Sequence, residues 1–326
     1  MRKEILEQSE ALRKTIELES DKLRKVSHKL RKYKRFYFVG CGSSLSTLLT
    51  INSLLDYLKS ENAKGVYTGF EFYYNTPYID EETAIILCSQ SGETRDTIYA
   101  ARRAKQEDIY CYTVGITNDE QSSLASIVDD VIITKAGKEQ AIIATKTYIT
   151  QLFVLYSLFL SEKFDRKLKE LPAICQSLLT KVEEECKRAA IKFRDTKGFY
   201  VIASGVNYGL AYKVAMTMLM EGCYLHGCPV YAGEFRHGLI EKVEKGVDTM
   251  FLKSGLPSDE ITNKALEFCE RIGARTLVFD ADRYYKFDSI FGPFILIIPL
   301  EWFIYYLALE KGVDPAATRH IGKVRY

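Results

Sequence analysis

The sequence lacks a strong excess of either charge and lacks the cysteine pattern of a metal site. Lysine and arginine number 45 and aspartate and glutamate 43, which leaves a net charge of +2 over 326 residues. A chain this close to neutral offers no broad basic surface, so we expect no nucleic-acid partner. The eight cysteines form no CxxC pair and no zinc-like spacing with histidine. Because several lie inside apolar runs, we expect reduced thiols in a cytoplasmic protein without a metal site.

The chain also lacks the pattern of a signal peptide or of a membrane span. Its first residues, Met1-Arg2-Lys3-Glu4, have no apolar core. The longest apolar run, from Ile290 to Ala308, contains Pro293, Pro299 and Glu301. We therefore expect a buried strand followed by a helix in this run, and no membrane partner.

Two stretches share one form: an apolar run of strand length, then small and hydroxyl residues, then a sequence able to form a helix. They are residues 36–44 (FYFVGCGSS) and residues 85–95 (IILCSQSGETR). Unpaired N–H groups and the dipole at a helix start favour an anion, so hydroxyls there suit a phosphate. Helix capping explains a single turn of this kind. The hydroxyls of Ser89, Ser91 and Thr94, with that of Thr97 just beyond, exceed what one cap can use, which favours a phosphate pocket closed by both turns.

Strand-like and helix-like segments alternate along the first half. The expected strands are 36–40, 66–67, 84–88, 109–116 and 130–134, with helices at 44–59 and 94–105 and a long buried helix at 142–161. Such alternation requires crossovers, which give a parallel sheet with helices on both faces. Ligands of such sheets bind at the carboxyl ends of the strands, where both hydroxyl-rich turns fall.

The second half repeats this pattern. Residues 199–205 (FYVIASG) echo residues 36–42 (FYFVGCG) at an offset of 163 residues, which predicts an internal duplication of one α/β domain. The second copy has no counterpart of SQSGET, so we expect it to keep the fold and to lack that phosphate turn. The expected organisation is a helical segment at 1–35, a phosphate-binding domain at 36–165, a linking helix at 166–195, a second domain at 196–311 and a tail at 312–326.

Two titratable side chains are candidates for chemistry. Glu221 ends a long apolar helix, and loss of water there would raise its pKa toward the range of a general base. The alternative is a solvated helix end. His237 lies in a polar loop with two glycines, where an imidazole can approach a ligand, although a lone histidine is more often structural.

The remaining histidines and the tail are less informative. We expect His28 on the surface and His226 in the core, and the sequence assigns no role to His320. The tail from Asp314 lacks a helical stripe. It is either frayed or folded back over a pocket, where it would deliver Lys323.

Five motifs together resemble the sugar isomerase (SIS) domain proteins. In order they are 41–44 (CGSS), 89–94 (SQSGET), 144–146 (ATK) with 150–151 (TQ), 233–238 (GEFRHG) and 323–326 (KVRY). The resemblance covers essentially the whole chain and is to the double-domain branch, which includes the isomerase half of glucosamine-6-phosphate synthase and the fructosamine-6-phosphate deglycases. It implies an α/β fold of two tandem SIS domains, each a doubly wound parallel sheet flanked by helices.

The resemblance also implies roles for individual residues. The sugar phosphate would be held by Ser43, Ser44, Ser89, Gln90, Ser91 and Thr94. Glu221 would move a proton between C1 and C2, His237 from the partner subunit would assist ring opening, and Lys323 would lie over the sugar. The substrate pocket would include Gly42, Glu139 and Ala144. The active unit would be a homodimer or a tetramer.

Three departures separate this chain from the synthase. No glutaminase domain precedes the expected SIS pair and no cysteine follows Met1, so glutamine is not expected as the nitrogen source. Met218 stands where the synthase carries a lysine on the helix before its catalytic glutamate. Residues 69–78, 227–237 and 301–306 look more like the deglycases.

The expected function is therefore a cofactor-independent fructosamine-6-phosphate deglycase. It would convert a 6-phosphorylated ketosamine and water to glucose 6-phosphate and a free amine or amino acid. Two alternatives stay open: a glucosamine-6-phosphate deaminase or isomerase, and a non-catalytic sugar-phosphate sensor that controls a partner. The sequence does not indicate which amine is released.

Overall fold

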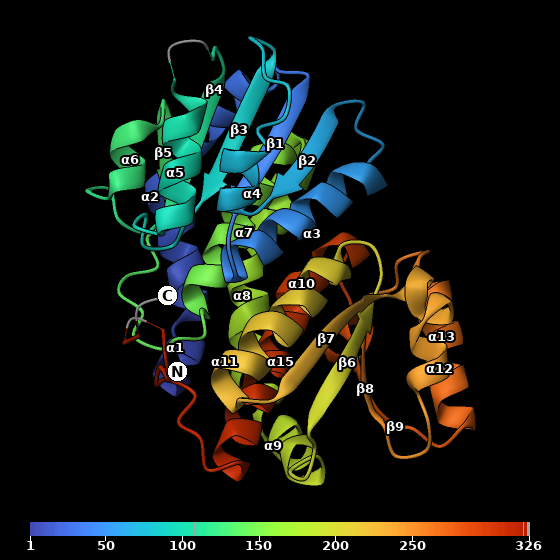
Figure 1. Cartoon of the computed structure of the whole chain (residues 1–326). Coiled ribbons are helices and arrows are strands. Elements are labelled where there is room, and N and C mark those ends of the chain that lie inside the picture. Colours follow the sequence, from blue (N-terminus) through green and yellow to red (C-terminus); the bar gives the residue numbers. More distant parts are fainter. Residues whose placement is uncertain (107–108, 322, 325–326) are drawn as a thin grey trace. The chain divides into compact units, whose positions relative to one another are not determined.

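The computed structural model describes residues 1–106, 109–321 and 323–324. Within them the chain forms two compact units, each built on its own parallel sheet (Figure 1). The N-terminal unit consists of Gln8–Glu139 and Lys146–Pro172. The C-terminal unit consists of Met1–Glu7, Gln140–Thr145 and Ala173–Tyr326.

The sheet of the N-terminal unit has five parallel strands in the order β2-β1-β3-β4-β5. The strands are β1 (Arg35–Gly40), β2 (Ala63–Tyr67), β3 (Thr83–Cys88), β4 (Tyr112–Thr117) and β5 (Asp130–Ile133). β1 and β3 are neighbours although β2 lies between them in the sequence. This order is the crossover topology that the alternating pattern predicted, so the carboxyl ends of β1 and β3 meet at one edge.

Helices cover both faces of this sheet (Figure 1). One face carries α4 (Gly69–Tyr74), α5 (Arg95–Ala104) and α6 (Ser123–Ile127), and the other carries α2 (Gln8–Leu30), α3 (Ser43–Tyr57) and α7 (Lys146–Phe159). Tyr37 and Val39 point into the first layer, in a cluster with α4, α5 and α6. Phe36 and Phe38 point the other way, and their ring centroids lie 5.3 and 5.5 Å from that of Phe159 on α7. The alternation of a strand thus fills both layers of the core.

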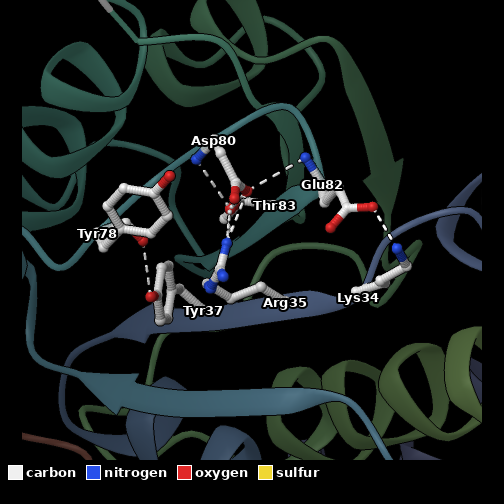
Figure 2. A network of polar contacts seen from close by, with 7 residues as sticks. All are labelled: Lys34, Arg35, Tyr37, Tyr78, Asp80, Glu82 and Thr83. Atoms are coloured by element: carbon white, nitrogen blue, oxygen red, sulfur yellow. Dashed lines mark hydrogen bonds and ion pairs between the residues drawn. The ribbon is translucent and has the colours of Figure 1, made fainter.

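A polar network ties the start of β1 to the loop before β3 (Figure 2). Asp80 accepts hydrogen bonds from the guanidinium of Arg35 at 2.6 Å and from the hydroxyl of Thr83 at 2.7 Å. The hydrogen bond from Arg35 holds the pKa of Asp80 below its ordinary value. The hydroxyl of Tyr37 donates to the carbonyl of Tyr78 at 2.8 Å. The network therefore anchors the amino ends of these strands, at the edge opposite the hydroxyl-rich turns.

The sheet of the C-terminal unit repeats this strand order. Its strands are β6 (Gly198–Ala203), β7 (His226–Tyr231), β8 (Asp248–Lys253) and β9 (Arg275–Asp280), in the order β7-β6-β8-β9 and all parallel. This matches β2-β1-β3-β4 position by position. β6 begins 163 residues after β1, at Gly198 and Arg35 respectively, which is the offset of the sequence repeat.

Helices also flank both faces of the second sheet. η3 (Ala232–His237) and α13 (Asp259–Arg271) share a core cluster with Ile202 and Phe251. On the other face Phe303 of α15 (Gly292–Glu310) contacts Phe199 and Phe279. The remaining elements are α1 (Arg2–Leu6), η1 (Glu162–Phe164), α8 (Asp165–Lys181), α9 (Glu183–Lys192), α10 (Asn207–Lys213), η2 (Val214–Leu219), α11 (Met220–Cys223), α12 (Leu239–Lys242), α14 (Ala281–Tyr284) and η4 (Ser289–Phe291).

Two local predictions are wrong. The apolar run after residue 290 contains no strand: η4 leads directly into α15, with Pro293 in the first turn, where no N–H partner is needed. A continuous apolar run of this length suits a helix buried on all sides. Ser289–Glu310 is long and apolar enough to cross a membrane, but 89% of its most apolar window is buried in the described structure.

His226 is exposed rather than buried, because β7 is an edge strand.

A third difference concerns the predicted helix at 142–161. It begins only at Lys146, and residues Gln140–Thr145 belong by their contacts to the C-terminal unit.

Candidate active site

Two hydroxyl-rich turns lie side by side at the carboxyl edge of the N-terminal sheet. β1 leads through Gly42 into α3, and β3 leads through residues 89–94 into α5. The last residues of the two strands, Gly40 and Cys88, pair with each other in the ladder. Both helix starts therefore present backbone N–H groups at the same edge, which is the arrangement that favours an anion.

Part of the hydroxyl set supports the second turn itself. Ser89 is buried, and its hydroxyl accepts the N–H of Gly92 at 3.1 Å and lies 2.9 Å from the hydroxyl of Thr94. The hydroxyl of Ser91 accepts the N–H of Glu93 at 3.1 Å. These contacts fix the loop in one conformation, so the hydroxyls are preorganised for a ligand.

Gly92 is required by the shape of this turn. Its φ is +66°, and a Cβ atom at this position would lie 2.1 Å from the hydroxyl oxygen of Ser122. Any side chain would therefore meet both backbone strain and a collision. The sequence alone did not reveal this collision, because Ser122 is distant along the chain.

Three other predicted phosphate ligands make no side-chain hydrogen bond within the described part of the chain. They are Ser43 and Gln90, which are half-buried, and Ser44, which is buried. Their polar atoms are available to a ligand at the edge where the two turns meet. The N-terminal unit thus supplies six polar side chains and two helix starts within one pair of adjacent turns.

The equivalent turn of the C-terminal unit is filled by a side chain of the protein. Asp259, the first residue of α13, accepts the N–H groups of Ser254 at 2.8 Å, Gly255 at 2.9 Å and Leu256 at 3.2 Å. These N–H groups follow β8, the strand that corresponds to β3. A carboxylate therefore lies against the N–H groups at this turn, where SQSGET stands in the first unit.

Glu221 lies on the short helix α11, directly after the π-helical segment η2. π-Helical turns are rare and often occur at functional sites. Burial raises the pKa of Glu221 to about 7, and the positive charge of Lys213 opposes this rise. A carboxyl with this pKa can both accept and return a proton near neutral pH. The structure therefore excludes a fully solvated helix end.

Lys213 is a residue that the sequence reasoning missed. It is fully buried on α10, and its ammonium donates to the carbonyl of Ala144 at 2.7 Å. The side chain of Ile143 packs against Gly222, since a Cβ atom on this glycine would lie 2.1 Å from Ile143 Cδ1. These contacts hold residues 140–145 against the helix of Glu221. The sequence feature that could have pointed to Lys213 is the presence of a lysine within a long apolar helical run.

A cavity of about 360 Å³ opens at Glu221 within the C-terminal unit. Its lining consists of Ile142, Met220, Glu221, Tyr224, Leu225, His226, Ala317, Thr318, Arg319, His320 and Ile321. The N–H of Ile142 donates to the carbonyl of Ala316 at 3.3 Å. The described part of the tail is thus folded against the residues around Glu221. Gly322, Arg325 and Tyr326, which belong to the predicted tail, lie outside the described residues.

The other predicted catalytic residues do not line this cavity in the described part of the chain. The ammonium of Lys323 donates to the carbonyl of Thr318, which does line it. His237 is exposed at the end of η3, where its Nε2 accepts a hydrogen bond from Arg236 at 3.2 Å. The structure therefore brings Glu221 and the tail together and leaves His237 apart within one chain.

The predicted pocket residues Glu139 and Ala144 have structural contacts. The carboxylate of Glu139 accepts the N–H of Lys146 at 3.1 Å and the hydroxyl of Thr147, so it caps the start of α7. Ala144 acts through its carbonyl, which accepts the hydrogen bond from Lys213.

Comparison with known proteins agrees with this picture. A family model described as the SIS domain matches residues 29–161. The chain is 30% identical to the fructoselysine 6-phosphate deglycase of Escherichia coli over 297 residues, which cover 90% of this chain and 86% of that enzyme. The chain belongs to the family of SIS-domain proteins. The matched range covers the first of the two predicted SIS domains, and the assignment of the C-terminal unit as a second one stays a prediction.

A second group of relatives is longer than this chain. The glutamine–fructose-6-phosphate aminotransferase (isomerizing) of Clostridium tetani is 29% identical over 99% of this chain, which spans only 58% of that protein. Among solved structures, the C-terminal domain of the glucosamine-fructose-6-phosphate aminotransferase of Francisella tularensis has a TM-score of 0.84 at 26% identity and covers 96% of both chains. The glucosamine-6-phosphate deaminase of Thermotoga maritima shares the fold, with a TM-score of 0.81 at 22% identity over 98% of this chain and 97% of that one.

Proposed function

We propose that this protein is a deglycase of 6-phosphorylated ketosamines. The substrate would be a fructose 6-phosphate unit whose C1 carries the nitrogen of an amine or amino acid. The products would be glucose 6-phosphate and the free amine. The observation that carries the proposal is the carboxyl of Glu221, with a pKa near 7 beside a cavity, in a chain that matches a deglycase along most of both lengths.

The phosphate group would bind at the paired turns of the N-terminal unit. Two adjacent helix starts supply N–H groups and a favourable dipole, and the hydroxyls of Ser43, Ser44 and Ser91 would add donors to the phosphate oxygens. Ser89 and Thr94 would keep the loop in shape while contributing to the same site. The bound phosphate would then position the open-chain sugar for the reaction.

Glu221 would carry out the proton transfer. It would remove a proton from C1 of the ketosamine while the carbonyl oxygen on C2 takes up a proton from solvent, which gives an enaminol with a hydroxyl on C2. Glu221 would then return its proton to C2 as the nitrogen loses its own proton to solvent, which leaves an imine between C1 and the nitrogen. Water then adds to the imine and the amine leaves, so that C1 becomes the aldehyde of glucose 6-phosphate. A base whose pKa is close to the operating pH suits this exchange.

The differences from the aminotransferases support a deglycase over an aminotransferring isomerase. Met218 stands at the position where the synthase type carries a lysine before the glutamate. The deglycase from Escherichia coli is matched over 86% of its length.

We further propose that His237 and Lys323 complete the site in an oligomer. His237 is exposed and lies outside the cavity lining of its own chain, which suits a group given to a neighbouring subunit. Lys323 is tied through Thr318 to the tail segment that lines the cavity, so a small movement would carry its ammonium toward the sugar.

Substrate tests with the purified full chain separate the proposal from its alternatives. Release of glucose 6-phosphate from the 6-phosphate of fructoselysine supports a deglycase. Ammonia from glucosamine 6-phosphate, with no glucose 6-phosphate from the ketosamine, would refute it in favour of a deaminase. Glu221→Gln should retain binding and lose turnover, whereas a sensor would keep every property in this variant.

A further inference from the structure

We propose that the cavity at Glu221 binds the amine portion of the substrate, that this portion carries a carboxylate, and that Arg319 recognises the carboxylate. This inference rests on the proposed function and narrows its substrate class to ketosamines of amino acids. It also adds a role to the tail, which would contribute a specificity-determining residue.

The position of the cavity follows from the chemistry at Glu221. A base that removes a proton from C1 must lie next to C1, and C1 is the atom that bears the nitrogen. The phosphate is on C6, at the far end of the open-chain sugar. The residues around Glu221 are therefore the residues that meet the group attached to the nitrogen.

The cavity has room for an amino acid. Its volume of about 360 Å³ lies within the range of small-molecule sites. Ile142, Met220 and Leu225 supply an apolar wall. A deaminase that releases only ammonia has no use for such a space beyond the sugar.

The charges of the lining favour an anion beside the apolar wall. Among the described lining residues, Arg319 is the one arginine or lysine and Glu221 the one acid. His226 and His320 add two further groups that can carry positive charge. Because the pKa of Glu221 is about 7, its carboxyl is partly protonated near neutral pH, and this reduces its electrostatic repulsion of a second carboxylate.

Arg319 is exposed and contacts an aromatic ring of the cavity lining. Its guanidinium lies over the ring of Tyr224, 5.0 Å from the ring centroid, and Tyr224 itself lines the cavity. A guanidinium stacked on an aromatic face keeps its planar edge available for two parallel hydrogen bonds to a carboxylate. Lysine at this position would supply charge but not the paired geometry.

Two matched substrates test the inference: the 6-phosphorylated ketosamines of glycine and of glycinamide, which differ only in the carboxylate. We expect the native protein to prefer the glycine compound by about tenfold or more in kcat/KM, mostly through KM. Arg319→Gln should remove this preference by lowering kcat/KM for the glycine compound much more than for the glycinamide compound, and Arg319→Lys should restore part of it. Arg24→Gln, which changes an exposed arginine on α2, serves as the matched control with native preference.

The outcomes separate this inference from the proposed function. Equal kcat/KM for both compounds in the native protein, or an equal loss for both in Arg319→Gln, overturns the role of Arg319 and leaves the deglycase intact. If neither compound is turned over, the proposed function fails, and calorimetric binding of the same compounds then decides. Tighter binding of the glycine compound that disappears in Arg319→Gln supports the inference, and equal affinities overturn it.

Discussion

The carboxylate of Asp259 accepts the backbone N–H of Ser254 at 2.8 Å, and the next two N–H groups, of Gly255 and Leu256, donate to the same oxygen. In the N-terminal unit the corresponding turn carries hydroxyls and no acid in this position. The two units therefore satisfy the same feature of their fold in different ways. The C-terminal unit provides an anion from its own chain, and in the proposed function the N-terminal unit keeps its donors for the substrate phosphate.

Asp259→Ala should lower the free energy of unfolding by about 2–4 kcal/mol, because three N–H groups lose a charged acceptor in a buried place. Asp259→Asn should lower the free energy of unfolding by less, since an amide oxygen can still accept hydrogen bonds from these N–H groups. Urea unfolding measures both changes. Asp21→Ala removes an exposed carboxylate and is the control. A loss in Asp259→Ala no larger than that of the control would contradict the structural role of this carboxylate.

The rate of the proposed reaction should follow the ionisation of Glu221. Because burial raises its pKa to about 7, the base form is scarce below neutral pH, and kcat/KM should rise with pH until about 7. Glu221→Gln should reduce kcat by about 10²–10⁴-fold and remove this dependence. Steady-state rates between pH 5 and 9 give the profile. A profile of the native protein that is flat through pH 7 would exclude Glu221 as the base.

The same carboxyl should destabilise the fold as it ionises. Its pKa is raised in the folded protein from an ordinary value of 4.5 to about 7, so the folded state prefers the protonated form. This stabilising contribution is complete below pH 4.5 and is lost as the pH rises through 7. The free energy of unfolding of Glu221→Gln, taken relative to that of the native protein, should therefore be up to about 3 kcal/mol larger at pH 8 than at pH 4.5. Urea midpoints at both pH values measure the gain, and an equal difference at both would contradict the raised pKa.

Lys213→Met should shift the acidic limb of the rate profile to higher pH, because the buried ammonium lowers the pKa of Glu221. It should also cost stability, since the hydrogen bond to Ala144 is lost. Lys311→Met provides the matched control: Lys311 likewise donates to a backbone carbonyl, that of Thr196 at 2.6 Å, in the same unit. In Lys311→Met the acidic limb of the rate profile should stay at the same pH as in the native protein. A limb that does not move in Lys213→Met would show that the lysine is only structural.

Gly92→Ala should be much more damaging than Gly246→Ala. Both glycines have positive φ, +66° and +84°, but a Cβ atom collides with Ser122 at the first and meets nothing within 4 Å at the second. Backbone strain alone costs about 1 kcal/mol, which is the expected effect at Gly246. Gly92→Ala should cost several kcal/mol or abolish binding of the sugar phosphate, measured by urea unfolding and by calorimetry. Equal effects would show that the turn can rearrange.

Much of the fold could be predicted from local patterns. Apolar runs of strand length, separated by helix-forming stretches, predicted each of the five strands of the first sheet. The repeat at a fixed offset predicted the second sheet, because a duplicated pattern folds in the same way. The error after residue 290 arose because a fully buried helix and a buried strand are both continuously apolar, and two prolines suggested a break that the helix accommodates.

The contacts around the site could not be predicted, because they join residues that are distant in sequence. Lys213 reaches Ala144, and Arg319 stacks on Tyr224. Residue patterns nominated Glu221 and the hydroxyl turns as candidates, and the resemblance treated Glu139 and Ala144 only as lining. Their contacts show one capping a helix and the other receiving a buried ammonium.

The C-terminal unit is assembled from three separate stretches of the chain. Its first stretch includes Arg2, whose guanidinium lies 5.5 Å from the ring centroid of Trp302 and pairs with Glu183. During synthesis on the ribosome, α1 is therefore made well before α15 and cannot meet Trp302 until the residues between them have been translated. Until then α1 lacks the surface against which it packs.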